Sequence, residues 1–220
     1  YRRQRQMCIR DSVEATVNLA RQAITAGVSR FVFVSSVKVN GEETSERPYT
    51  AFDEPAPTDP YGISKLEAEV ALKKLAEETG LEVVIVRPPL IYGPGVRANF
   101  QRLMQLVKMG LPLPLGAINN RRSMVAVENL HDLLILCTSH PAAVGQTFMV
   151  SDDHDVSVST LLRMLAAAMN KKSLLIPVPS TLLAGMAGLL GKSAVANRLL
   201  GSLQVCLLYT SDAADDTPCV

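Results

Sequence analysis

The sequence predicts an α/β protein in which helices cover both faces of a parallel sheet. Residues 13–26 place apolar side chains at helical spacing, and Gly27 follows as a typical helix terminator. The runs RFVFVSS at 30–36 and EVVIVRPP at 82–89 are apolar and β-branched, as buried strands require. A second helical pattern between them ends near Gly80. Helix and strand alternating, with wholly apolar strands, is the pattern of a parallel sheet.

The chain after Gly95 is less regular, and we expect a smaller mixed α/β subdomain there. The predicted helices are 100–108, 129–137 and 160–169, and the predicted strands are SMVAV at 123–127 and QTFMVS at 146–151. LLAGMAGLLG at 182–191 is too short to span a bilayer, so we interpret it as a buried C-terminal helix and expect no membrane insertion.

The overall composition gives no support for several classes of partner. The chain has 220 residues, of which 48% are hydrophobic, and its net charge is +1, so the overall balance gives no reason to expect nucleic acid or an anionic membrane. His131, His140 and His154 lack ligand partners at metal-binding spacing, and DDHD at 152–155 is interpreted as a polar turn. We therefore expect no metal.

The two ends differ from the rest of the chain. A coding sequence for RRQRQMCIRDS at 2–12, read as its reverse complement, encodes the CLLYTSDAAD found from residue 206. Such an inverted repeat resembles an adapter used in DNA library preparation, so we interpret 1–12 and 206–220 as flanks derived from an adapter. Three of the four cysteines lie in these flanks, and the native part retains only Cys137.

A possible catalytic pair lies in TDPYGISKLEAE. Tyr61 and Lys65 are four residues apart at the start of the second helix, so their side chains share one face. A nearby ammonium group favours phenolate and lowers the pKa of a tyrosine. Such a pair can transfer a proton to or from a sugar hydroxyl, although many surface helices contain the same spacing. Ser35 and Ser36 end the preceding strand, at the sheet edge where α/β proteins bind ligands.

Three segments resemble, in order, motifs of the NAD-dependent epimerase/dehydratase family. FVFVSSVKVNG at 31–41, DPYGISKLEAE at 59–69 and VIVRPPLIYGPG at 84–95 carry the resemblance. The family is the extended branch of the short-chain dehydrogenases/reductases and includes UDP-glucose 4-epimerase. The resemblance implies a Rossmann-like doubly wound parallel sheet, with 13–95 in the NAD-binding domain and 96–205 mostly in a substrate-binding subdomain.

The same resemblance implies that the N-terminal strands and the GxxGxxG phosphate loop belong upstream of Val13. Residues 13–205 alone are therefore expected to bind NAD poorly.

The resemblance also implies roles for individual residues. Ser36 would hydrogen-bond the reacting oxygen, Tyr61 would be the general acid/base, and Lys65 would lower its pKa and hold the nicotinamide ribose. The implied cofactor-binding residues are Val34, Tyr61, Lys65, Pro88 and Pro89. The implied substrate-binding residues are Ser36, Lys38, Asn99, Phe100, Leu115 and Arg122, with the arginine on the nucleotide diphosphate.

The implied reaction is 4-epimerisation of a UDP-sugar with NAD as cofactor, NADP being possible. Val37 and Lys38 stand where the dehydratase branch has Asp and Glu, so elimination of water would lack its acid and base. A 4-keto-sugar reductase uses the same residues and is the first alternative. A non-catalytic NAD(P)-binding regulatory protein and a steroid or flavonoid reductase stay open. We further expect a cytoplasmic homodimer.

Overall fold

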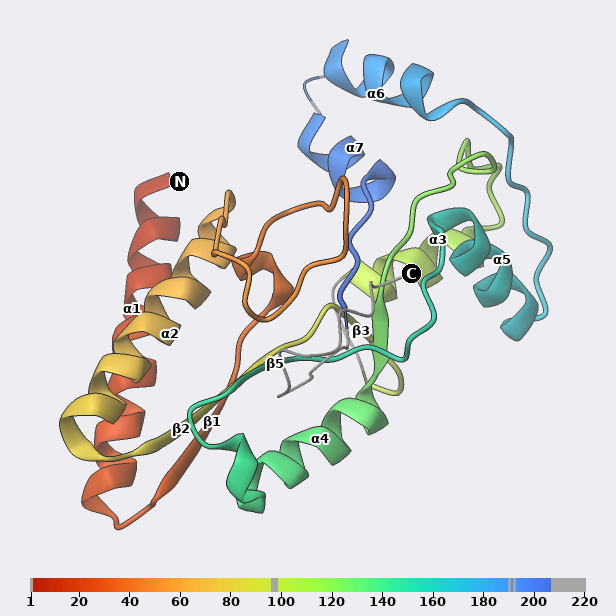
Figure 1. Cartoon of the computed structure of the whole chain (residues 1–220). Helices are drawn as coiled ribbons and strands as arrows, with labels where there is room; N and C mark the ends of the chain where they lie inside the picture. Colours follow the sequence, from red (N-terminus) through yellow and green to blue (C-terminus); the bar gives the residue numbers. More distant parts are fainter. Residues whose placement is uncertain (1, 96–98, 190, 192, 207–220) are drawn as a thin grey trace.

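A three-stranded parallel sheet forms the centre of the computed structural model, which describes residues 2–95, 99–189, 191 and 193–206. Its strands are β1 (Arg30–Val34), β2 (Glu82–Arg87) and β5 (Thr147–Met149), in the order β1-β2-β5 (Figure 1). The predicted parallel sheet is therefore confirmed.

Helices cover both faces of this sheet. α1 (Arg2–Thr25) and α2 (Pro60–Thr79) pack on one face, and α4 (Val127–Ser139) packs on the other (Figure 1). Strand β2 is buried from both sides, because Val83 and Ile85 join the α1–α2 core while Val84 and Val86 join the α4 core. This double burial explains why the strand is apolar at consecutive positions.

Helix α2 has clear sequence signals at both ends. The Oδ1 atom of Asp59 accepts a hydrogen bond from Gly62 N at 2.6 Å, which makes Asp59 the N-cap. Pro60 occupies the first turn, where a missing N–H costs nothing. Gly80 ends the helix in the left-handed conformation, at φ 75°.

A second layer of structure lies beyond the main sheet. β3 (Leu90–Tyr92) pairs in parallel with β4 (Met124–Ala126). The remaining helices are α3 (Asn99–Met109), α5 (Val158–Ala168), α6 (Ser180–Leu189) and α7 (Ser193–Leu200), with short 3-10 turns η1 (Val37–Val39) and η2 (Pro141–Ala143). Their main core is formed by side chains of α3, α5 and the connecting segments, including Val107, Ile118 and Leu162.

Two expectations differ from the structure. The stretch containing α4 and β5 was assigned mostly to the substrate subdomain, but β5 pairs with β2 and α4 covers the main sheet. The helix predicted at 182–191 exists as α6, yet none of its residues is buried. The apolar pattern indicated a helix correctly, but the prediction that the helix is buried was wrong.

The flanks are described only in part. The backbone of residues 2–12 continues α1, while 207–220 lie outside the described residues, so the adapter origin of both flanks stays a prediction. Cys206 is disulfide-bonded, and Cys137 is free and buried. Within the described part of the chain, no helix is both long and apolar enough to cross a membrane.

Candidate active site

The site is built where β1 and α2 meet. Ser36 follows β1 in extended conformation and caps η1, its Oγ accepting a hydrogen bond from Lys38 N at 3.3 Å. Tyr61 lies in the first turn of α2, and its side chain is close enough to the Ser36 hydroxyl for that group to affect the pKa of the phenol. A glycine at position 62 lets the first turn of α2 lie close to η1, because a Cβ atom there would be 2.5 Å from the Lys38 carbonyl oxygen. The structure thus brings together the predicted serine and tyrosine.

Lys65 lies one turn further along α2. Its Nζ donates a hydrogen bond to the Val34 carbonyl oxygen at 2.9 Å, at the end of β1. The same atom is 4.7 Å from the centroid of the Phe33 ring and 6.0 Å from that of the Tyr61 ring. Burial lowers the pKa of Lys65, and the charge of Glu69 opposes that change. Lys65 is therefore held at the strand end beside the tyrosine.

The effect of Lys65 on the pKa of Tyr61 stays a prediction, and other groups also act on this phenol. Burial raises the pKa of Tyr61, and the charge of Asp59 adds to the rise, while the charge of Lys38 and the nearby Ser36 hydroxyl oppose it. The charge of Lys38 therefore favours the phenolate. Lys65 donates its hydrogen bond to the Val34 carbonyl oxygen and lies 6.0 Å from the centroid of the Tyr61 ring.

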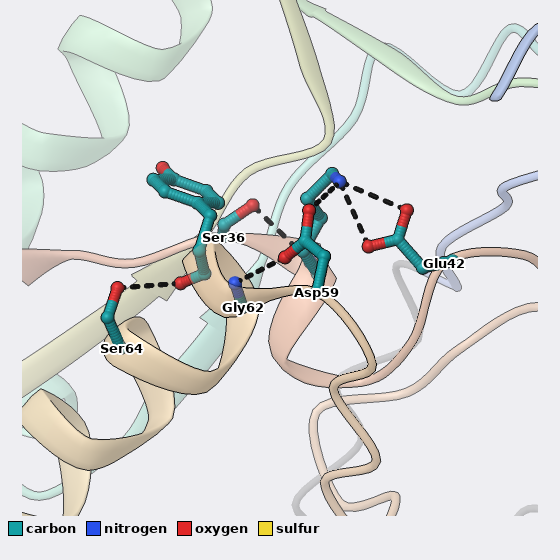
Figure 2. Close-up of polar contacts among 7 residues, drawn as sticks. Ser36, Glu42, Asp59, Gly62 and Ser64 are labelled. Atoms are coloured by element: carbon teal, nitrogen blue, oxygen red, sulfur yellow. Dashed lines mark hydrogen bonds and ion pairs between the residues drawn. The ribbon is translucent and has the colours of Figure 1, made fainter. Parts of the chain in front are cut away.

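Lys38 is the centre of a charged network that the sequence did not reveal. Its Nζ lies 2.6 Å from Asp59 Oδ2, 3.0 Å from Glu42 Oε1 and 3.1 Å from Glu42 Oε2 (Figure 2). Burial alone would raise the pKa of Asp59, but the hydrogen bonds from Lys38 and Gly62 N lower it on balance. Asp59 thus orients Lys38 with one oxygen and caps the tyrosine helix with the other.

A cavity of about 510 Å³ lined by Glu42, Asp59 and Asn197, among others, opens beside the network.

A buried ion pair fixes α2 on the sheet. Arg87 at the end of β2 donates two hydrogen bonds to Glu69 of α2, at 3.0 Å and 2.6 Å, and a third to Asn40 Oδ1 at 3.0 Å. The three residues are 3%, 1% and 2% exposed. The sequence held one signal for this network, since Glu69 occupies the same helix face as Leu72. The network joins the strand end, the helix and the loop after η1.

The predicted cofactor-binding residues lie at the same sheet edge. Val34 is 37% exposed, and its carbonyl oxygen binds Lys65. Pro88 accepts a hydrogen bond from Val37 N at 3.1 Å, which places it beside Ser36, and Pro89 is buried next to it. Val34, Lys65 and Pro88 are therefore neighbours of Ser36 or Tyr61, as a nicotinamide site requires. Their contact with a cofactor stays a prediction.

The predicted substrate residues are only partly brought together. Burial lowers the pKa of Arg122, and the charge of Glu42, which also binds Lys38, opposes this shift. Phe100 is 9% exposed and packs near Tyr92, with 6.1 Å between ring centroids, so its side chain belongs to the core. Leu115 is partly buried against α5. Asn99 begins α3, and its side chain lies outside the described residues.

The arrangement is suited to proton transfer at an alcohol or carbonyl. A substrate oxygen beside Ser36 and Tyr61 would meet two hydroxyl groups, one able to exchange a proton and one to donate a hydrogen bond. Asp59 has a lowered pKa and a bound cation, so it holds no proton to donate to a leaving group near neutral pH. The site therefore has groups for proton transfer at a substrate oxygen, and Asp59 is not a suitable acid for elimination.

Sequence comparison identifies relatives over most of the chain. A family model described as "NAD dependent epimerase/dehydratase family" matches residues 2–151. A UDP-glucose 4-epimerase of Vibrio cholerae is 50% identical over 199 residues, covering 90% of this chain and 61% of that protein. An N-acetyl-alpha-D-glucosaminyl-diphospho-ditrans,octacis-undecaprenol 4-epimerase of Escherichia coli O157:H7 is 30% identical over 181 residues, 79% of this chain and 53% of that one. The chain thus spans about half to three fifths of the length of these relatives.

Solved structures share the fold. A UDP-N-acetylglucosamine 4-epimerase from Bacillus cereus superposes with a TM-score of 0.66 at 23% identity, covering 77% of this chain and 59% of that one. MoeE5, solved in complex with UDP-glucose and NAD, gives a TM-score of 0.62 at 27% identity, with 74% and 58% covered. The predicted Rossmann-like fold is confirmed.

Proposed function

Since the chain belongs to the NAD-dependent epimerase/dehydratase family, we propose that the whole protein is an NAD-dependent UDP-sugar 4-epimerase. The observation that carries the proposal is the meeting of the Ser36 and Tyr61 side chains beside Lys65, at the carboxyl ends of parallel strands. The 50% identity with a UDP-glucose 4-epimerase supports the same reaction.

Each residue has a defined task in this reaction. Tyr61 as phenolate takes the proton of the sugar C4 hydroxyl and later returns it, while Ser36 hydrogen-bonds the same oxygen. NAD, when bound, would supply the acceptor for the C4 hydride and the donor for its return to the opposite face of the 4-keto sugar. In this proposal Lys65, which binds the carbonyl at the end of β1, would bind the nicotinamide ribose, and Arg122 would bind the diphosphate.

Residues near the site favour epimerisation over dehydration. The positions after Ser36 carry Val37 and Lys38, and Lys38 is paired with Glu42 and Asp59. A dehydratase needs a carboxylic acid that can protonate a leaving hydroxyl, whereas the pKa of Asp59 is lowered. A one-way 4-keto-sugar reductase would use the same groups and is the alternative that the experiment must separate.

The proposal includes the oligomeric state and the location of the enzyme. α1 and α2 lie side by side and expose Leu19 (58%), Ile63 (41%) and Val70 (59%), which supports a homodimer formed through these helices. We place the protein in the cytoplasm, where nucleotide sugars are made.

The test uses the gene at the full length of its relatives. Proton NMR would follow UDP-glucose and UDP-N-acetylglucosamine, each incubated with the enzyme and no added reductant. The C4 epimer is expected to accumulate to equilibrium, because the hydride returns to the substrate. If no epimer forms, but a 4-keto sugar with NAD(P)H is consumed, the protein is a reductase. If neither sugar changes while NAD binds, the proposal fails in favour of a binding protein.

A further inference from the structure

Charge is distributed unequally between two parts of the sequence. Residues 99–127 and 156–206, here named the basic subdomain, contain nine basic residues and no acidic residue. The basic residues are Arg102, Lys108, Arg121, Arg122, Arg163, Lys171, Lys172, Lys192 and Arg198. The net charge of +1 for the whole chain therefore conceals a strongly cationic part. Such asymmetry is typical of proteins that bind an anionic surface.

Helix α6 of the basic subdomain carries an exposed apolar face. Leu183 and Ala187 are half-buried, and Leu183 packs against the subdomain core. Leu182, Met186 and Leu189 follow the spacing of one helix face and are 55%, 52% and 91% exposed. An ordinary surface helix presents polar or charged residues outward, and α6 has none that is charged. The helix lies at the periphery, at the opposite end of the molecule from α4 (Figure 1).

A second exposed apolar group lies in the segment that leads to α6. Leu113 N donates a hydrogen bond to Leu174 O at 2.8 Å, and Ile176 N donates one to Leu113 O at 2.8 Å, so the two segments run together. Leu111, Leu174 and Ile176 along this pairing are 56%, 53% and 49% exposed. Lys171 and Lys172, both exposed, lie three and two residues before Leu174 in the chain. Cations and exposed apolar side chains therefore occur in one connected stretch.

We propose that the basic subdomain docks on an anionic membrane surface, with the α6 face and the Leu174–Ile176 segment entering the interface. Lysines and arginines attract acidic lipid headgroups, and leucines and methionine bury apolar area at the acyl boundary. The ten-residue α6 is too short to cross the bilayer, so the association is peripheral. This inference does not depend on the proposed reaction.

Two other occupants fit the surface less well. Single-stranded nucleic acid is bound by basic grooves with aromatic stacking platforms, whereas the basic subdomain contains one aromatic residue, Phe100, which is buried. A second copy of the chain would bring two cationic surfaces together around the apolar face, and like charges oppose such pairing. An anionic lipid surface complements both the charge and the apolar face.

The experiment is vesicle sedimentation of the chain at its full native length. Vesicles of equal parts phosphatidylglycerol and phosphatidylcholine are compared with pure phosphatidylcholine, at about 0.05 M and about 0.5 M salt. Binding to the anionic vesicles is expected, with strong weakening at the higher salt. The Lys171→Glu/Lys172→Glu variant should lower the partition coefficient by at least about 25-fold, roughly fivefold for each lysine lost. The Leu182→Asp/Leu189→Asp variant should lower it comparably.

Matched controls separate the proposed surface from general charge and hydrophobicity. Lys73→Glu/Lys74→Glu changes two exposed lysines of α2, and Ile135→Asp/Leu136→Asp changes two side chains of α4 that are each 54% exposed. Both controls should keep binding within about twofold, with unchanged circular dichroism. Absence of binding by the unaltered chain would overturn the proposal. So would equal losses in the controls, or an oligomer that only the α6 variant dissociates.

Discussion

The two parts of the molecule use charge differently. Around the main sheet, cations and carboxylates are paired across elements, as in Arg87–Glu69, Lys38–Asp59 and Arg30–Glu82. The basic subdomain has no acidic residue of its own and exposes an uncharged helix. Internal pairing fixes the catalytic helix in one position, whereas a surplus of one charge sign is available to a partner. Charges around the main sheet therefore hold the elements in position, whereas those of the basic subdomain can attract an anionic partner.

The largest effect on turnover is expected from removing the phenol oxygen of Tyr61. Tyr61→Phe should lower kcat of the full-length enzyme by roughly 10²- to 10⁴-fold, the usual contribution of a general acid/base. Because the side chain is 49% exposed, the fold and cofactor affinity should change little. Steady-state kinetics and calorimetry with NAD measure the two quantities.

A matched control is Tyr92→Phe, which removes the hydroxyl that donates to Asp152 at 2.7 Å on β3. That variant should retain kcat within a few-fold. Comparable loss of turnover in both variants would mean that Tyr61 acts through the structure and not as a proton carrier.

The sequence predicted the part of the fold that depends on local patterns. Apolar runs identified β1 and β2, and capping signals identified α2, because these depend on residues close in the chain. The pairing of β5 with β2 and the exposure of α6 depend on contacts between distant segments, which periodicity does not contain.

The same distinction holds in the site. The family resemblance identified Ser36, Tyr61 and Lys65, and the structure brings them together. It did not indicate that Lys38 favours the phenolate, because that effect depends on where Asp59 and Glu42 hold the ammonium group. Charges that act through space were the least predictable feature.

The buried ion pair should produce the second-largest effect. Glu69→Gln leaves the guanidinium of Arg87 buried without a counter-charge, and removing one partner of such a pair costs about 3–5 kcal/mol. Urea unfolding measures the loss. In the control Glu78→Gln, the lost partner is Lys74 at 3.9 Å on the exposed face of α2, which is worth about 0–0.5 kcal/mol. Equal losses in the two variants would remove the distinction between buried and exposed pairs.

The smallest expected effect is on the pH profile of kcat, which two substitutions should shift in opposite directions. Tyr61 must be deprotonated to act as a base, and its pKa is raised by burial and Asp59 but lowered by Lys38. Lys38→Met should therefore move the rising limb of kcat to higher pH. Asp59→Asn, which keeps an oxygen able to cap α2, should move it to lower pH. Each shift should be below about one unit, because Tyr61 is 49% exposed and solvent and salt partly screen the neighbouring charges.

The opposite directions of the two pH shifts are decisive, because a general loosening of the site would move both profiles the same way. Lys73→Met, an exposed lysine of the same helix α2, serves as the charge control and should leave the profile unchanged. Shifts of the same sign in Lys38→Met and Asp59→Asn would show that the network acts by holding geometry alone. Opposite shifts would mean that the paired charges also set the ionisation of the tyrosine, so that in this part of the molecule one set of contacts determines both position and reactivity.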